Sequence, residues 1–305
     1  MSILYMKEFI ILTRAHIGLV VLPSFWLGSL FAMVVGYKFD LSIFLLGFLI
    51  IFLTYASASY INDYYDYEAD KHNRQIGFSG GSGVLQKHPQ LKESTRSLAK
   101  GYILISVILT IYLSWTTYIP LWSIAYIATG AFFAYYYSAP PFRLCYRGIG
   151  ELPHFIAGLM NAGWGYLIIA GTIDMNILIF AIPFSLHLLT VILLFEIPDK
   201  EADISGGKQN FIVKYGREKG YILIAIIFWT ASIYFILLAT TNWYADHINF
   251  WIPSIASMIP SFIATYISIK RPREQTQATS YAIKGAISLF AFSFFVLIYF
   301  LYLQL

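Results

Sequence analysis

The sequence predicts an all-α membrane protein with nine transmembrane helices. Hydrophobic residues make up 58% of its 305 residues and charged residues only 12%, whereas roughly a quarter of a soluble domain is charged. Uncharged runs of ~20 residues, long enough to cross a bilayer, recur along the whole chain. The runs lack the alternating pattern of a membrane barrel, so helices are the remaining way to satisfy the backbone in lipid. We therefore expect one integral-membrane domain over residues 1–305, in contact with the lipid bilayer and not with nucleic acid.

The spans follow from the uncharged runs taken in order. The first run is too long and too uniformly apolar for a cleavable signal peptide, so it counts as a span. The third run is twice the needed length and contains Pro120, which favours a helical hairpin because proline breaks a continuous helix. The predicted spans cover residues 15–37, 41–62, 101–118, 121–138, 152–173, 175–195, 221–245, 248–269 and 285–305.

The lysines and arginines predict the orientation of these spans. With nine spans, 19 of the 20 basic residues fall in connections on one side of the membrane, and only Lys38 falls on the other. Basic loops remain on the cytoplasmic side of a membrane. We therefore expect the amino terminus inside, the carboxyl terminus outside, and a location in the inner or plasma membrane.

Two acidic windows, residues 62–70 and 196–203, follow spans two and six on the side that is predicted to be cytoplasmic. If span two continues as a helix, Asn62, Asp66 and Asp70 lie on one face, because residues four apart share a face. Pro198 is expected to end span six. A short new helix can begin there with proline in its first turn, which places Asp199 and Asp203 on one face. The windows contain eight of the 16 carboxylates: Asp63, Asp66, Glu68, Asp70, Glu196, Asp199, Glu201 and Asp203.

This clustering of acidic residues predicts a cation site. Like charges at this spacing repel one another, so a cation is expected to neutralise them. Lysine is one possibility, but oxygen ligands without cysteine fit magnesium better. The alternative is a pair of solvated, acidic helix ends. The windows recur four spans apart, which favours two pseudo-equivalent four-helix units that face each other across one cytoplasmic mouth.

Several segments resemble those of one known family. NDYYDYEAD (62–70) and DKEAD (199–203) look like the two aspartate motifs of the UbiA superfamily of membrane prenyltransferases. YSAPPFRLCYRGIGEL (137–152) resembles the loop after the fourth span of these proteins. FSGGSGVL (78–85) and GGKQNFIVKYG (206–216) are similar to segments of the 1,4-dihydroxy-2-naphthoate polyprenyltransferases, the MenA-like branch. The resemblance covers essentially the whole chain. It departs from that branch at Phe195, Glu196 and Pro198, where an asparagine pair and an arginine are typical.

The resemblance implies a magnesium-dependent prenyltransferase with its active site on the cytoplasmic face. The enzyme would transfer the prenyl group of an allylic prenyl diphosphate to an aromatic acceptor, 1,4-dihydroxy-2-naphthoate or a related quinone precursor. Residues implied to act in catalysis are Asp63, Asp66 and Asp199. Residues implied to hold the metal are Asn62, Asp66, Asp70, Asp199 and Asp203. Glu196 is either a further metal ligand or a residue that binds a different acceptor. Residues expected to bind substrate are Arg14, Asn62, Arg74, Arg143, Arg147, Lys208 and Tyr137.

Other interpretations of the same residues exist. A cytoplasmic lysine or arginine often only fixes topology. A membrane terpene cyclase would ionise the same diphosphate and trap the cation within the same molecule. A transporter is the alternative from another class, but transporters usually have ionisable groups within their spans. The nine predicted spans contain no Asp, Glu, Lys or Arg, which favours an enzyme that works at one membrane face.

Overall fold

A computed structural model describes residues 5–15, 18, 22–71 and 79–305 of the chain. Every regular element in these ranges is a helix. The α-helices are α1 (Met6–Leu12), α3 (Pro23–Val34), α4 (Leu41–Tyr65), α5 (Tyr67–Asp70), α6 (Val84–Lys87), α7 (Lys92–Thr116), α8 (Ser123–Tyr136), α9 (Glu151–Ala170), α10 (Met175–Ser205), α11 (Phe211–Thr240), α12 (Trp251–Lys270) and α13 (Gln275–Tyr302). Short 3₁₀ turns occupy Pro89–Leu91 and Leu144–Tyr146.

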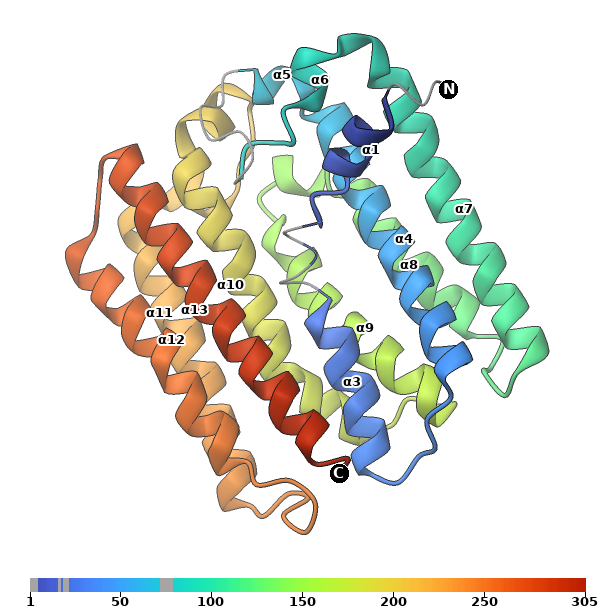
Figure 1. The fold of residues 1–305 in the computed structure, drawn as a ribbon. Helices are drawn as coiled ribbons and strands as arrows, with labels where there is room; N and C mark the ends of the chain where they lie inside the picture. The colour runs from blue at the N-terminus through green and yellow to red at the C-terminus, as the bar shows by residue number, and fades with distance from the viewer. Residues whose placement is uncertain (1–4, 16–17, 19–21, 72–78) are drawn as a thin grey trace.

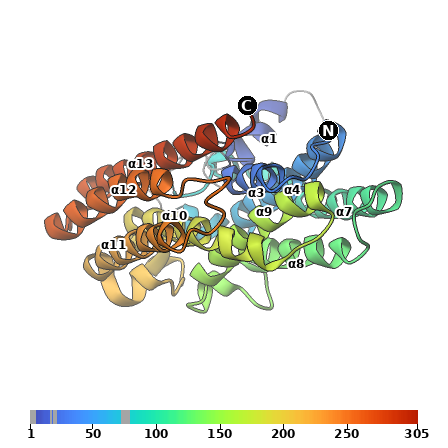
Figure 2. The ribbon, with the colours of Figure 1, turned by 90° about the horizontal axis from the view of Figure 1, so that it is seen from below.

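The long helices form a bundle with two sides. Figures 1 and 2 show α10, α11, α12 and α13 on one side, and α3, α4, α7, α8 and α9 on the other. The two sides meet where α10 packs on α9 and α13 packs on α3. The short helices α1, α5 and α6 lie together at one end of the bundle, and α13 finishes at the opposite end (Figure 1).

Each predicted span overlaps one of the helices of this bundle. Six helices of the described chain are long and apolar enough to cross a membrane: α4, α7 with the turn before it, α10, α11, α12 and α13. The ranges predicted as spans one, four and five correspond to α3, α8 and α9, which have 12, 14 and 20 residues. The all-helical membrane fold is thus confirmed, while the nine-span topology and the two pseudo-equivalent units stay predictions.

The first predicted span contains α3, and its extent stays a prediction. α3 begins at Pro23, whereas the predicted span begins at residue 15, and residues 16–17 and 19–21 between them lie outside the described residues. Proline fits the first turn of a helix because it has no N–H group to leave unpaired. Arg14, the residue before the predicted span, lies in the left-handed region with φ +47°, so the helical conformation of α1 does not continue through it. The 12 residues of α3 extend ~18 Å at 1.5 Å per residue, less than the ~30 Å of a bilayer core.

Two prolines have opposite effects on the bundle. Pro120 separates α7 from α8, so the predicted hairpin is confirmed. The prediction that Pro198 ends span six is wrong, because α10 continues through it to Ser205. A proline can bend a helix without ending it where neighbours stabilise the distorted turn. Here Gln275 donates to the carbonyl of Pro198 over 2.9 Å, and Arg217 donates to the carbonyl of Ile197 over 2.8 Å.

Glycines allow α3 and α9 to pack with their backbones in contact. A Cβ atom added to Gly28 would lie 1.9 Å from the carbonyl oxygen of Ala162. A Cβ added to Gly165 would lie 1.9 Å from the carbonyl oxygen of Phe25. Small residues permit such close helix packing in membranes. This packing helps to set the position of α9, which forms one wall of the cavity described next.

Candidate active site

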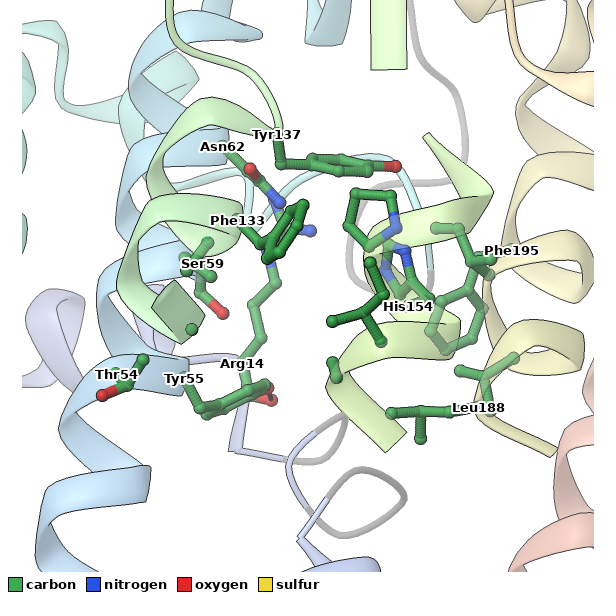
Figure 3. A pocket seen from close by; sticks show the side chains of 18 of the residues that line it. Arg14, Thr54, Tyr55, Ser59, Asn62, Phe133, Tyr137, His154, Leu188 and Phe195 are labelled. Carbon is green, nitrogen blue, oxygen red and sulfur yellow. Dashed lines mark hydrogen bonds between the residues drawn. The ribbon is translucent and has the colours of Figure 1, made fainter. Parts of the chain in front are cut away.

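A cavity of about 240 Å³ lies between α4, α8, α9 and α10. Figure 3 shows Thr54, Tyr55, Ser59 and Asn62 projecting from α4 on one side of it, with Leu188 and Phe195 opposite. One end of the cavity is acidic and polar, and its remaining walls are mainly apolar and aromatic. Polar end residues include Asn62, Asp66, Asp70, Ser79, Glu196, Asp199, Asp203, Lys208 and Asn210; wall residues include Ile51, Ile127, Phe133, Ala157, Met160, Leu188, Val191 and Phe195.

The first acidic window forms one side of the polar end. The helix breaks at Asp66, between α4 and α5. Backbone bonds from Asp66 N–H to the carbonyl of Asn62 and from Asp70 N–H to that of Asp66, both 2.8 Å, preserve the helical spacing across the break. Asn62, Asp66 and Asp70 therefore all line the cavity. Burial, reinforced by Asp66, raises the pKa of Asp70 to about 7, although Lys208 acts in the opposite direction.

The second window forms the facing side, on α10. Because this helix is continuous, Glu196, Asp199 and Asp203 line the cavity at helical spacing beyond Phe195. The Ser79 hydroxyl donates to Asp199 over 2.6 Å, and the side-chain amide of Asn210 donates to Asp203 over 2.7 Å. The structure thus brings together the two windows that the sequence separates by more than a hundred residues.

Lys208 links the two windows. Its ammonium group lies 3.0 Å from Asp66 and 3.2 Å from Asp203. Burial disfavours the charged lysine, but Asp203 and Asp66 outweigh this and raise the pKa of Lys208 well above its ordinary value. Lys208 is therefore a fixed cation at the polar end of the cavity.

Arg14 reaches the cavity from the segment before α3. Its guanidinium forms an ion pair with Asp63, which also accepts a hydrogen bond from the Ser82 hydroxyl. The Tyr55 hydroxyl donates to the backbone carbonyl of Arg14 over 2.7 Å. Arg14 lines the cavity, but Asp63 is not among the lining residues. The structure thus pairs Asp63 with Arg14, and the catalytic role of Asp63 stays a prediction.

The other predicted substrate-binding residues have different positions. Tyr137 lines the cavity (Figure 3). Arg143 and Arg147 are exposed and do not line it. Arg143 stacks on the ring of Tyr146 at 3.9 Å, and Arg147 donates to a loop carbonyl. Arg74 lies outside the described residues.

Several residues at the polar end or in the cavity were not among the predicted site residues. Tyr146 donates to Asp66 over 2.7 Å, although it lies in a loop 80 residues away. His154 lines the cavity, and its ring contacts that of Tyr137 at 5.2 Å between centroids. Ser79 and Asn210 hydrogen-bond to the second window. A signal was available for three of them: Ser79, Tyr146 and Asn210 lie in the segments 78–85, 137–152 and 206–216 that resemble the family.

The residues at the polar end fit a magnesium ion by their chemistry. Six buried carboxylates face two cations among the described residues, so four negative charges are left unbalanced when all are ionised. Their donors are oxygens, which Mg²⁺ prefers, and Asn62 adds an amide oxygen. No three acidic, histidine or cysteine side chains converge on a ready-made metal position within the described ranges; Lys208 lies between Asp66 and Asp203 instead. The six carboxylates are Asp63, Asp66, Asp70, Glu196, Asp199 and Asp203.

The fold and the cavity define an integral membrane enzyme that combines a polar, acidic end with apolar walls. Comparison with family models identifies the UbiA prenyltransferase family over residues 20–295. The chain therefore belongs to the UbiA prenyltransferase family, and it is a prenyltransferase. Membership of this family favours an enzyme over the transporter that the sequence analysis considered.

Solved structures show the same fold at low sequence identity. A UbiA homolog from Archaeoglobus fulgidus bound to GPP and Mg²⁺ is 15% identical with a TM-score of 0.67, and the match covers 94% of this chain and 98% of that one. A digeranylgeranylglyceryl phosphate synthase structure is 20% identical with a TM-score of 0.63 and 98% coverage of both chains. An apo UbiA homolog from Aeropyrum pernix K1 is 13% identical with a TM-score of 0.63, covering 90% of this chain and 95% of that one. No curated protein sequence matches the chain.

Proposed function

We propose that this protein transfers the prenyl group of an allylic prenyl diphosphate to an aromatic acceptor in a Mg²⁺-dependent reaction. One observation carries the proposal: a single cavity has both acidic windows and Lys208 at one end and apolar, aromatic walls beyond them. A prenyl diphosphate has the same division into a charged head and an apolar tail. The family and the Archaeoglobus homologs that bind GPP or DMAPP with Mg²⁺ support this assignment.

Each part of the cavity has a role in this reaction. Asn62, Asp66, Asp70, Asp199 and Asp203 would hold the metal, which supplies charge to the departing diphosphate. Lys208 and Arg14 add fixed cations at the same end, so negative charge that develops there is stabilised without reorganisation. Aromatic walls such as Phe133 and Tyr137 favour a carbocation over their π faces and exclude water from it. An electron-rich carbon of the acceptor ring then forms the new bond and loses a proton.

We infer that the acceptor is 1,4-dihydroxy-2-naphthoate or a related quinone precursor. The support is the resemblance of residues 78–85 and 206–216 to the dihydroxynaphthoate branch. We place the active site on the cytoplasmic face, because both windows and Lys208 occupy the basic side of the predicted topology. Substrates would then meet there, with the head from the cytoplasm and the tail from the bilayer.

One assay tests this function. Purified protein is incubated with Mg²⁺ and radiolabelled geranyl diphosphate, with and without 1,4-dihydroxy-2-naphthoate. We expect a prenylated acceptor and diphosphate release that both require Mg²⁺. A cyclic hydrocarbon formed without acceptor would instead identify a terpene cyclase. Absence of diphosphate release with any acceptor would contradict both reactions.

A further inference from the structure

Glu196 is a buried carboxyl group that lines the cavity. It is 4% exposed, and neither of its side-chain oxygens has a hydrogen-bond partner among the described residues. Burial raises the pKa of Glu196 well above its ordinary value, and Glu151, Asp203 and Asp199 raise it further while Lys208 lowers it. A buried polar group without a hydrogen-bond partner costs free energy even when it is neutral, and native structures rarely leave one without a reason. A donor supplied by a ligand would remove this cost.

The position of Glu196 indicates which ligand that would be. Along α10 the lining residues change from apolar, at Leu188 and Phe195, to acidic, at Asp199 and Asp203. Glu196 lies at this change, between the end that would hold the diphosphate and the walls that would hold the prenyl tail. The bond that breaks in prenyl transfer joins these two parts of the donor. An acceptor has to approach at the same level.

His154 and Tyr137 add to the same region. Both line the cavity, and their rings are in edge contact (Figure 3). His154 Nδ1 lies 3.1 Å from the carbonyl oxygen of Gly150. A carbonyl can only accept, so Nδ1 carries the hydrogen and Nε2 of the neutral ring is left as an acceptor. Glu196 and Nε2 of His154 therefore both offer hydrogen-bond acceptors to a ligand.

We propose that Glu196, with His154 and the ring of Tyr137, forms the subsite that recognises the hydroxyl groups of an aromatic acceptor. The proposal rests on the prenyl-transfer function and specifies its second substrate. Hydroxyl groups on the ring donate to Glu196 and His154, while the Tyr137 ring packs against the acceptor. Glu196 would then be a specificity-determining residue, which is the second of the two roles that the sequence left open for it.

The experiment compares Glu196→Leu and Glu196→Gln with the wild-type protein. Leucine removes the polar carboxyl group at similar volume, a change that buried polar sites tolerate in folding, and glutamine keeps the shape. Glu201→Gln is the matched control, because Glu201 is on the same helix, pairs with Arg217 and does not line the cavity. Measured are the KM for 1,4-dihydroxy-2-naphthoate, the KM for geranyl diphosphate and the Mg²⁺ concentration for half-maximal rate. Folding is checked by thermal unfolding in detergent.

We expect Glu196→Leu to raise the acceptor KM about 10- to 100-fold, the range for loss of one strong hydrogen bond from a buried site. The geranyl diphosphate KM and the Mg²⁺ requirement stay within about 2-fold, as do all three values in the control. As a second readout, 1,4-dimethoxy-2-naphthoate, which has no ring hydroxyls, is a weaker competitor than the dihydroxy compound for wild type. Glu196→Leu abolishes this difference between the two compounds.

Three results would overturn the proposal. An unchanged acceptor KM in both variants removes any acceptor role from Glu196. A raised Mg²⁺ requirement with an unchanged acceptor KM makes Glu196 a metal ligand. Transfer by wild type only to geranylgeranylglyceryl phosphate, and to no hydroxylated ring, rejects this subsite while prenyl transfer itself stands. By contrast, failure of wild type to release diphosphate with any acceptor contradicts the proposed function as a whole.

Discussion

Lys208 shows how a single side chain connects segments that are distant in sequence. It pairs with Asp66 from the first window and Asp203 from the second. We predict that Lys208→Met raises the KM for geranyl diphosphate about 10- to 100-fold, because a hydrogen bond to a charged group contributes ~1.5–3 kcal/mol. The exposed Lys214 provides the control, and Lys214→Met should leave this KM unchanged. Equal effects of the two substitutions would show that this KM depends on the net charge of the protein and not on the position of Lys208.

The paired carboxylates give a second prediction for single residues. Asp66→Ala or Asp199→Ala should abolish prenyl transfer while the protein remains folded, because each removes a proposed ligand from the polar end of the cavity. Glu68→Gln is a suitable comparison, since Glu68 belongs to the first window but does not line the cavity and pairs with Lys71. Transfer rates and thermal unfolding are measured for all three variants. Appreciable turnover in either aspartate variant would exclude the metal-ligand role of that residue.

Sequence reasoning located the helical acids better than the basic residues in loops. Asn62, Asp66 and Asp70 share a face because helical spacing is regular, and this could be predicted. The exposed positions of Arg143 and Arg147 could not, because they depend on the path of a loop. Arg143 itself has φ +44°, a local conformation that no periodic pattern indicates. Contacts such as Tyr146 with Asp66 depend on the same tertiary path.

At the scale of elements, the contact between α3 and α9 gives a stability prediction. Gly28→Ala should destabilise the protein by about 1–3 kcal/mol or more, because the added Cβ meets backbone that cannot rotate away. Gly101 in α7 has open space around it, so Gly101→Ala should be neutral or stabilise the helix by up to about 1 kcal/mol. Thermal unfolding in detergent compares the two. A similar melting temperature for both variants would show that the α3–α9 contact does not limit stability.

The helix boundaries show what sequence can and cannot determine about elements. The apolar runs identified each long helix, because burial in lipid requires such a run. They did not reveal that α7 begins at Lys92 and α13 at Gln275, since polar first turns project beyond the apolar part. Pro120 and Pro198 look alike in sequence. Pro198 lies inside α10, where Gln275 of α13 donates to its carbonyl, whereas Pro120 lies between α7 and α8. The contact with Gln275 is tertiary, so the sequence does not reveal it.

At the scale of the whole molecule, orientation can be tested with the single cysteine. Cys145 is 1% exposed, so a Cys145→Ser background allows new cysteines to report on each face. We predict that Lys38→Cys reacts with an impermeant maleimide only from outside sealed vesicles, and that Lys270→Cys reacts only from the cytoplasmic side. This follows from the distribution of basic residues. Labelling of both positions from the same side would contradict the nine-span topology.

The course of α10 has a consequence for how the cavity can respond to its contents. One continuous helix carries Leu188, Glu196 and Asp203, so the apolar and acidic parts of that wall keep a constant spacing. The opposite wall breaks at Asp66, where α4 ends and α5 begins. Adjustment to substrates of different size should therefore occur on the α5 side, with α10 as the stationary reference. The two acidic windows have similar sequences, but we expect the first window to move with α5 and the second to stay fixed on α10.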